Sequence, residues 1–174
     1  MRKRLPLTFF NRSTTRVAEE LLGKFLVRKI RGREVAYMIT ETEAYDGPHD
    51  KASHASRGRT KRNEVMFTEA GAIYIYFTYG MHWMFNIVTG EKEYPAAVLI
   101  RAVDTIQGPA RLTKGLKIDK KLNAKKLGTK TGLWVEDRGV KIKRSAVRRT
   151  ARVGVAYAGK VWAHKPYRFI LELE

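Results

Sequence analysis

The 174-residue sequence contains no cysteine. This absence excludes disulfide bonds, thiol nucleophiles and cysteine-ligated zinc or iron–sulfur centres. The sequence also has no apolar run of about 18 residues, the length that a membrane-spanning helix needs. Its basic N-terminal stretch, MRKRLPLTFFNRS, lacks the apolar segment and the small-residue cleavage site of a signal peptide. We therefore expect a soluble intracellular protein, in the cytoplasm, nucleoid or nucleus, that is not secreted.

Acidic residues are scarce: 17 Asp and Glu stand against 35 Lys and Arg, and the formal net charge is +18. A charge of this size attracts polyanions, and nucleic acid is the leading candidate. The alternatives are an RNA-binding protein of the ribosomal type and a membrane-surface protein. Because no strongly amphipathic basic helix stands out, the membrane is the weakest of the three.

The length and composition suit one domain over residues 1–174, since 44% of the residues are hydrophobic and no repeat or low-complexity linker divides the chain. An apolar face predicts a helix over residues 14–22, with Gly23 as its stop. The segments FLVRKI and EVAYMITETEAY, on either side of a turn at residues 31–33, predict a β-hairpin.

Further elements follow from composition and periodicity. Strands are predicted at 72–79, 82–88, 96–103, 140–144 and 167–173, and short helices at 108–116 and 119–127. This mixture predicts an α+β fold, a single compact domain with a mainly antiparallel, curved sheet and flanking helices.

The stretch ETEAYDGPHD, residues 41–50, gathers four of the 17 acidic residues. If residues 34–45 form one strand, the two-residue period places Glu41, Glu43 and Tyr45 on its apolar side. A solvated strand end and a pair of acids at the lip of a cleft are both open interpretations. Carboxylates at this spacing lie roughly 7 Å apart at Cβ, which overlaps the separations used to hydrolyse glycosidic bonds. Many strands carry the same spacing by chance.

Two histidines near these acids, His49 and His54, invite a metal-site interpretation. The five-residue gap between them matches none of the common ligand spacings, so a histidine that hydrogen-bonds in a polar pocket is favoured. No P-loop or dinucleotide fingerprint occurs, because the SRGRTKRN loop lacks the GK[ST] ending. We expect no metal and no cofactor.

Residues 73–86, IYIYFTYGMHWMFN, alternate so that Tyr74 and Tyr76 lie on one face of a strand. Tyr79 and Gly80 then supply a turn, which predicts a hairpin with an aromatic residue at its tip. An aromatic-rich core hairpin is the alternative. In a basic protein, a projecting tyrosine also suits stacking on a base or wedging between base pairs.

Three basic clusters accompany these elements and predict a phosphate-binding rim, although each cluster alone is most often a solvated face. The clusters are Arg57, Arg59, Lys61 and Arg62; Lys114, Lys117, Lys120, Lys121, Lys125 and Lys126; and Lys141, Lys143, Arg144, Arg148, Arg149 and Arg152.

Several motifs occur in one order from about residue 6 to residue 169: ETEAY, a histidine nine residues after Tyr45, IYIYFTYGMHWMFN, LIRAV, GPARL, and ARVGV followed by AGKVWAHKPYRF. Their order resembles that of the alkyladenine DNA glycosylase family, also called 3-methyladenine DNA glycosylases. The resemblance implies a monofunctional, monomeric DNA repair enzyme that flips a damaged purine out of duplex DNA and hydrolyses its N-glycosidic bond. It also implies a protruding β-hairpin that inserts into the minor groove.

The resemblance assigns the chemistry to the region of the acidic stretch. It implies that Glu43 is the general base that deprotonates a water directed at C1′ of the flipped nucleotide. Arg101 and the backbone of Val153 are implied to help hold that water. One carboxylate then suffices, which leaves Glu41 a structural role. No lysine nucleophile is implied, so strand cleavage is not expected to follow base removal.

Five positions correspond to a base pocket in the same family. Tyr45, Tyr76 and His54 are implied to sandwich and orient the base. The backbone carbonyl of Ala52 is implied to accept a hydrogen bond from it, and Asn86 to clash with the amino group of normal guanine. An alkylated purine is cationic, which favours its departure and its stacking on aromatic faces.

The DNA contacts implied or expected lie around these positions. Tyr79 is implied to fill the gap that flipping leaves in the duplex. The other expected DNA-binding residues are Arg59, Thr60, Arg62, Met81 and His82.

Three features depart from the family pattern: the connection between LIRAV and GPARL is short, His82 stands where an aromatic residue is usual, and Ala156-Tyr157 replaces a Gly-His pair. The lesion preference is therefore not carried over.

Two alternatives to damaged-base excision stay open at this point. An RNA-binding module could use the same charge and aromatic residues, but a pure phosphate binder gains nothing from a carboxylate that faces its ligand. Hydrolysis of a different glycoside by Glu41 and Glu43 would depend on both acids and survive high salt, whereas activity on DNA falls steeply with salt.

Overall fold

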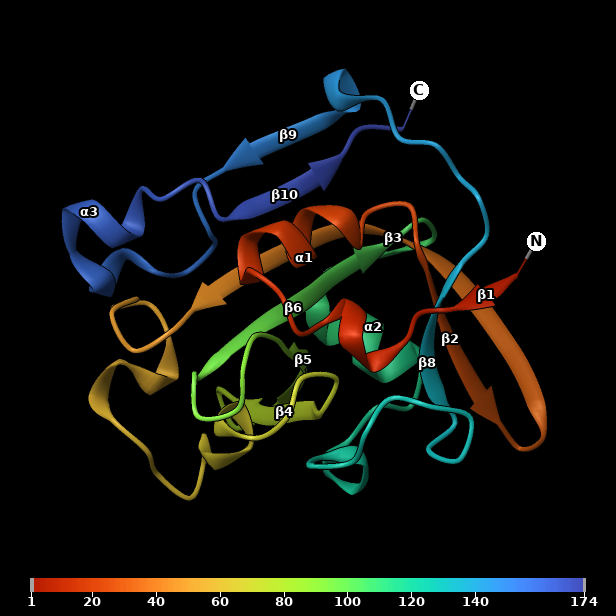
Figure 1. The fold of residues 1–174 in the computed structure, drawn as a ribbon, viewed down its shortest axis with the longest axis horizontal. Coiled ribbons are helices and arrows are strands. Elements are labelled where there is room, and N and C mark those ends of the chain that lie inside the picture. The colour runs from red at the N-terminus through yellow and green to blue at the C-terminus, as the bar shows by residue number, and fades with distance from the viewer. Residues whose placement is uncertain (1, 174) are drawn as a thin grey trace.

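The computed structural model describes residues 2–173, and the ten strands of this region form one sheet (Figure 1). The strands are β1 (Lys3–Arg4), β2 (Phe25–Ile30), β3 (Arg33–Asp46), β4 (Ile73–Thr78), β5 (His82–Val88), β6 (Ala96–Val103), β7 (Ile106–Gln107), β8 (Leu133–Asp137), β9 (Val147–Thr150) and β10 (Arg168–Leu171). Neighbours along the sheet follow the order β1-β8-β2-β3-β6-β5-β4, while β7 pairs with β6, and β10 pairs with β3 and β9. All of these pairs are antiparallel. The prediction of a compact α+β domain with a mainly antiparallel sheet is confirmed.

Three α-helices accompany the sheet in residues 2–173: α1 (Thr14–Glu20), α2 (Pro109–Gly115) and α3 (Gly159–Ala163). Helix α1 packs on β3 and β6, and α2 packs on β5 and β6 (Figure 1). The main core lies between these helices and the sheet. It includes Phe10, Leu21, Phe85, Ile100 and Leu112, all buried.

The predicted hairpin of residues 25–30 and 34–45 is confirmed, with a turn one residue shorter than the expected 31–33. Ile30 pairs with Arg33, so only Arg31 and Gly32 connect β2 to β3. Both residues have positive φ, at 49° and 82°, as the two-residue turns that match strand twist require. This turn fixes the register of β3, the strand that carries the acidic stretch.

The helix predicted at residues 119–127 is wrong. Only Lys120–Leu122 form a short 3-10 turn. The following residues instead satisfy the backbone of β4, which ends the main path of the sheet. The amide of Ile73 donates to the carbonyl of Lys125 at 2.7 Å, and the amide of Ile75 donates to the Asn123 side chain at 2.8 Å. Bonding to an open strand edge therefore replaces local helix formation.

The strand predicted at 140–144 is also wrong, because this segment runs without strand pairing and β9 begins only at Val147. Its two apolar side chains, Val140 and Ile142, lie over Gly23. A Cβ atom at Gly23 would stand 2.7 Å from Ile142, so the close approach depends on glycine. The alternating pattern reflects packing on a turn and not membership of the sheet.

Two smaller buried clusters lie outside the main core. One contains Met66, Tyr74 and Ala97, with Tyr76 packed against it. The other contains Ala52, Val155 and Ala158, with Tyr45 and Trp162 packed against it. The candidate active site lies where these two clusters meet. Residues of both clusters line its inner cavity.

Candidate active site

The C-terminal half of β3 carries the acidic stretch through the middle of the sheet. It pairs with β6 on one side and with β10 on the other. Thr42 donates to the carbonyl of Ala18 in α1, whereas Glu41 and Glu43 both contact Arg101. The predicted alternation therefore holds at this end of the strand. The solvated-strand interpretation is wrong, because the Glu41 and Glu43 side chains are only 12% and 0% exposed.

The Glu43 carboxylate is held from both of its oxygens. Oε1 accepts a hydrogen bond from the backbone amide of Val153 at 2.8 Å, and Oε2 accepts one from the Tyr45 hydroxyl at 2.8 Å. Nη1 of Arg101 lies 3.4 Å from Oε1. A carboxylate offers about four acceptor sites, so these neighbours fix its orientation and still leave capacity for a further donor.

Glu41 is occupied by a second set of contacts. Its Oε1 accepts hydrogen bonds from Nε of Arg101 at 2.7 Å and from Nε of Arg168 in β10 at 2.6 Å. Arg101 therefore bridges the two carboxylates of β3. The pKa of Arg101 is raised above its ordinary value because the attraction of Glu43 and Glu41 outweighs the opposing effect of burial. The guanidinium remains a fixed positive charge beside Glu43.

A fully buried ion pair between Asp50 and Arg152 joins the two loops that contribute to the site. Both side chains are 0% exposed. Asp50 also accepts from the backbone amides of Asp46 and Ala52, each at 3.0 Å. Arg152 donates to the carbonyls of Ala44 and Trp162 and lies over the ring of Tyr45.

This pair corrects one prediction. Arg152 belongs to a basic cluster that was expected to bind phosphate, but a buried guanidinium paired with Asp50 cannot line such a rim. Arg152 directly precedes Val153 in the chain. Its buried ion pair with Asp50 therefore helps to position the Val153 amide, which donates to Glu43.

Two adjoining cavities lie beside these carboxylates. The inner cavity, of about 40 Å³, is lined by Tyr45, Ala52, Ser53, His54, Met66, Tyr74, Tyr76, Asn86, Ala97 and Tyr157. The outer cavity, of about 350 Å³, is lined by Tyr45, His54, Tyr76, Thr78, Tyr79, Met84, Leu99, Arg101, Pro109, Val153, Gly154, Val155 and Tyr157. All five residues predicted to form a base pocket therefore line the inner cavity. Three residues of the outer cavity, Tyr45, Arg101 and Val153, contact Glu43.

Neutral aromatic side chains dominate the inner cavity. His54 Nδ1 lies 2.9 Å from the Tyr74 hydroxyl, and its ring meets that of Tyr76 edge-on, with centroids 4.5 Å apart. Burial, aided by the charge of Arg62, lowers the pKa of His54 to about 4. Burial raises the pKa of Tyr74 to about 12 and that of Tyr76 further still. The cavity therefore offers uncharged ring faces at neutral pH, which suits the stacking of a flat, cationic ring.

The other two predicted pocket residues, Asn86 and Ala52, form hydrogen bonds that involve backbone carbonyl groups. The Asn86 side chain donates to the carbonyls of Tyr74 at 3.2 Å and Met84 at 3.4 Å, which orients its amide. The carbonyl of Ala52 accepts a hydrogen bond from the Tyr157 hydroxyl at 2.8 Å. From the sequence, Tyr157 is only a departure from a family pattern and has no predicted place in the pocket.

The β4–β5 pair carries the exposed residues beside the outer cavity. Thr78 pairs with His82, so Tyr79, Gly80 and Met81 form the tip. Tyr79 and Gly80 both have positive φ, at 51° and 64°. Tyr79 is 83% exposed and Met81 is 67% exposed. The alternative of an aromatic-rich core hairpin therefore does not describe its tip.

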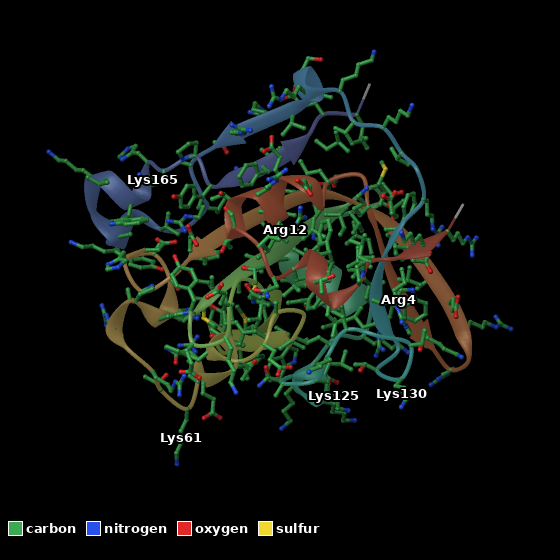
Figure 2. The ribbon with its side chains drawn as sticks, viewed as in Figure 1. Arg4, Arg12, Lys61, Lys125, Lys130 and Lys165 are labelled. Atoms are coloured by element: carbon green, nitrogen blue, oxygen red, sulfur yellow. The ribbon has the colours of Figure 1, made fainter. Side chains whose placement is uncertain are left out.

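The basic loop predicted to contact DNA is partly engaged with the protein itself. Arg59 forms an ion pair with Glu93 and lies over the ring of Phe67. The Thr60 hydroxyl accepts from the amide of Asn63, and Arg62 donates to the carbonyl of Phe77. Cationic side chains also project from several separate regions, as Lys61, Lys125, Lys130 and Lys165 show in Figure 2. The net charge alone therefore does not locate the nucleic-acid surface.

The acidic stretch contains no arrangement suited to a metal ion. Asp50 is saturated by Arg152 and two backbone amides, and His49 is exposed. No group of three or more His, Asp or Glu side chains that could hold a metal ion occurs within residues 2–173. Nor does that region contain a helix long and apolar enough to cross a membrane.

Comparison with known proteins connects this geometry to a family. The family model of methylpurine-DNA glycosylase matches residues 8–107 and 103–174. The two matches overlap at residues 103–107, which span the β6–β7 connection.

Curated relatives are similar over most of their length. A protein of Methanocella arvoryzae is 42% identical over 185 residues, which cover 95% of this chain and 90% of the relative. One of Myxococcus xanthus is 44% identical over 173 residues, covering 94% and 88%. One of Carboxydothermus hydrogenoformans is 42% identical over 187 residues, covering 97% and 95%. Each is named "Putative 3-methyladenine DNA glycosylase".

These findings define the class of the DNA N-glycosylases, hydrolases that cleave N-glycosidic bonds in DNA. Within that class, the chain belongs to the methylpurine-DNA glycosylase family, and its role is in DNA repair. The enzymatic prediction therefore replaces the alternative of a non-catalytic RNA-binding module.

Proposed function

We propose that the protein flips an alkylated or deaminated purine out of duplex DNA and hydrolyses its N-glycosidic bond with a water activated by Glu43. The names of the relatives support 3-methyladenine as one of these alkylated purines. One observation carries the proposal: a fully buried carboxylate is held by Tyr45, Val153 and Arg101, three residues that also line a cavity joined to an aromatic pocket.

In the proposed step, water attacks C1′ of the extrahelical nucleotide while Glu43 accepts a proton from it. A bond forms between the water oxygen and C1′, and the bond between C1′ and the base nitrogen breaks. Its electron pair leaves with the purine. A cationic alkylated purine departs as a neutral base, so no acid is needed on the leaving side, whereas a neutral deaminated purine must take up a proton as it leaves. General base catalysis of this kind contributes about 10²–10⁴-fold.

The attacking water is proposed to lie where Arg101 and the backbone of Val153 approach Glu43. The binding of Glu41 to both Arg101 and Arg168 supports a mechanism with a single catalytic carboxylate. It disfavours the alternative in which Glu41 and Glu43 act as a pair on another glycoside, because that mechanism needs both carboxyl groups free to act as acid, base or nucleophile.

Recognition of the base is proposed to rest on the inner cavity. Tyr45, Tyr76 and His54 would hold the purine between neutral rings, and Asn86 would exclude the amino group of normal guanine. Outside the pocket, Tyr79 would take the place of the flipped nucleotide in the duplex. Met81, His82, Arg59, Thr60 and Arg62 are proposed as DNA-surface contacts around it.

The decisive variant is Glu43→Gln. Glutamine has nearly the same shape, its side-chain oxygen can still accept from Val153, and the Tyr45 hydroxyl can accept from its amide. It cannot take a proton from water. We expect release of free base from duplexes with 7-methylguanine, 3-methyladenine, hypoxanthine or ethenoadenine to fall by at least about 10²-fold. Binding of the same duplexes should stay within about threefold, a difference of less than about 0.7 kcal/mol.

Glu69→Gln is the matched control, because Glu69 pairs with Lys126 on the surface and both side chains are more than half exposed. It should release base at the wild-type rate. Base release by Glu43→Gln at the wild-type rate would refute the mechanism. Equal losses of binding and release would instead make Glu43 a structural residue.

A further inference from the structure

Tyr157 stands between the two cavities of the active site. It lines both the inner cavity of about 40 Å³ and the outer cavity of about 350 Å³, together with Tyr45, His54 and Tyr76. An inner cavity of this size accommodates a few water molecules and not a purine ring system. A base that enters the inner cavity as far as Ala52 therefore requires that at least one lining side chain move.

The four shared side chains differ in how firmly they are held. Tyr45 bonds to the buried Glu43 carboxylate and lies under Arg152, and His54 bonds to Tyr74 and packs against Tyr76. Tyr157 is 68% exposed, and a single side-chain hydrogen bond, to the carbonyl of Ala52, holds it. Of the four, Tyr157 is the side chain that can leave with the least loss of contact.

The bond to Ala52 has a specific consequence. The hydroxyl is turned inward while the ring faces solvent, and burial is the largest cause that raises the pKa of Tyr157 above its ordinary value. At neutral pH the hydroxyl is therefore protonated and donates to the carbonyl. This carbonyl is the acceptor that the family resemblance implies for the flipped base, so a base that binds there must displace the hydroxyl.

We propose that Tyr157 is a gate of the base pocket: its hydroxyl occupies the Ala52 carbonyl in the free enzyme, and the side chain swings out when a purine enters. The inference rests on the proposed function. When the binding-competent state is only partly populated, the apparent affinity falls by that fraction. Tyr157 thus weakens capture of every extrahelical base by a common factor and makes firm stacking in the pocket a condition of binding.

The test compares Tyr157→Phe with the parent, both in the Glu43→Gln background so that the base stays attached. Phenylalanine keeps the ring and removes the hydroxyl. Equilibrium binding is measured at one fixed salt concentration with duplexes that carry ethenoadenine, hypoxanthine or no lesion. We expect about 2- to 10-fold tighter binding of both lesion duplexes, the range that loss of one hydrogen bond allows. Binding of the undamaged duplex should not change.

Tyr94→Phe is the matched control. Tyr94 is also partly exposed and also donates through its hydroxyl, to Asp46, but it lines neither cavity. It should leave all three affinities unchanged.

Unchanged or weaker lesion binding by Tyr157→Phe would overturn the gate. Weaker binding would identify the hydroxyl as a direct contact to the bound base. These outcomes leave the proposed function intact, because that function is judged separately by the loss of base release in Glu43→Gln. A parent that binds lesion and undamaged duplexes equally would overturn both proposals.

Discussion

The floor and the rim of the active site differ in how their side chains are satisfied. The floor consists of Glu43, Asp50, Arg101 and Arg152, and the side chains of Glu43, Asp50 and Arg152 are 0% exposed. The rim consists of Tyr79, Met81, Val153 and Tyr157, all between 48% and 83% exposed. Every charge of the floor has a partner within the protein, whereas the large apolar groups of the rim face solvent.

This difference separates two kinds of residue within one site. Breaking a buried ion pair leaves an uncompensated charge, so substitutions in the floor cost stability as well as activity. Exposed apolar groups gathered at one place mark a surface that a ligand covers. Substitutions in the rim should therefore change binding and leave the free energy of unfolding nearly unchanged.

The largest effect on stability is expected from Asp50→Asn. The change leaves the buried guanidinium of Arg152 without its counter-charge, and we expect a loss of about 3–5 kcal/mol in the free energy of unfolding. Urea denaturation measures it. Arg148→Ala is the control, because Arg148 and Glu172 form an exposed pair, and it should cost less than about 1 kcal/mol. A cost below about 1 kcal/mol for Asp50→Asn would mean that floor and rim are not energetically distinct.

A smaller effect, on binding alone, is expected from Tyr79→Ala. Removal of one stacking aromatic typically costs about 1–3 kcal/mol, so lesion-duplex affinity should fall by about 5- to 150-fold. Binding of undamaged duplex should fall less, and the free energy of unfolding should stay within about 0.5 kcal/mol. Fluorescence anisotropy with both duplexes measures the difference. If lesion and undamaged duplexes weaken equally, Tyr79 is a general DNA contact and not the residue that replaces the flipped nucleotide.

The smallest effect is a pH dependence from His54, which lines both cavities. Its pKa falls from an ordinary 6.5 to about 4 in the folded protein, so between these values the unfolded chain binds more protons. Its destabilising contribution is absent above about pH 6.5, grows as the pH falls and levels off below about pH 4. Urea denaturation of His54→Gln across this window should show a weaker pH dependence than the parent. Identical slopes would show that His54 does not titrate in this way.

The sequence predicted those parts of the molecule that depend on short-range patterns. The Arg31-Gly32 turn set the register of β3, and the order of motifs identified the positions that line the inner cavity. Hydrophobic periodicity predicted the wrong secondary structure where contacts with residues distant in the sequence determine the conformation. Residues 119–127 bind the edge of β4, and residues 140–144 pack over Gly23. Strands β1, β7, β8 and β9 and helix α3 were not predicted either.

The floor could be predicted only in part for the same reason. A run of Lys and Arg residues carries no signal that one member, Arg152, is buried against Asp50, 102 positions away. The inward turn of the Tyr157 hydroxyl depends equally on a contact with Ala52, 105 positions away. Local patterns do not encode such contacts.

Strand β10 affects the order in which the contacts around Glu41 and Glu43 can form. It is the last strand in the described chain, yet it flanks the segment of β3 that holds Glu41 and Glu43, and it supplies Arg168 to Glu41. A nascent polypeptide that has emerged only as far as β8 already contains both acids. It still lacks Val153 and Arg168, so the contacts that these residues make with Glu43 and Glu41 can form only after β10 has emerged as well.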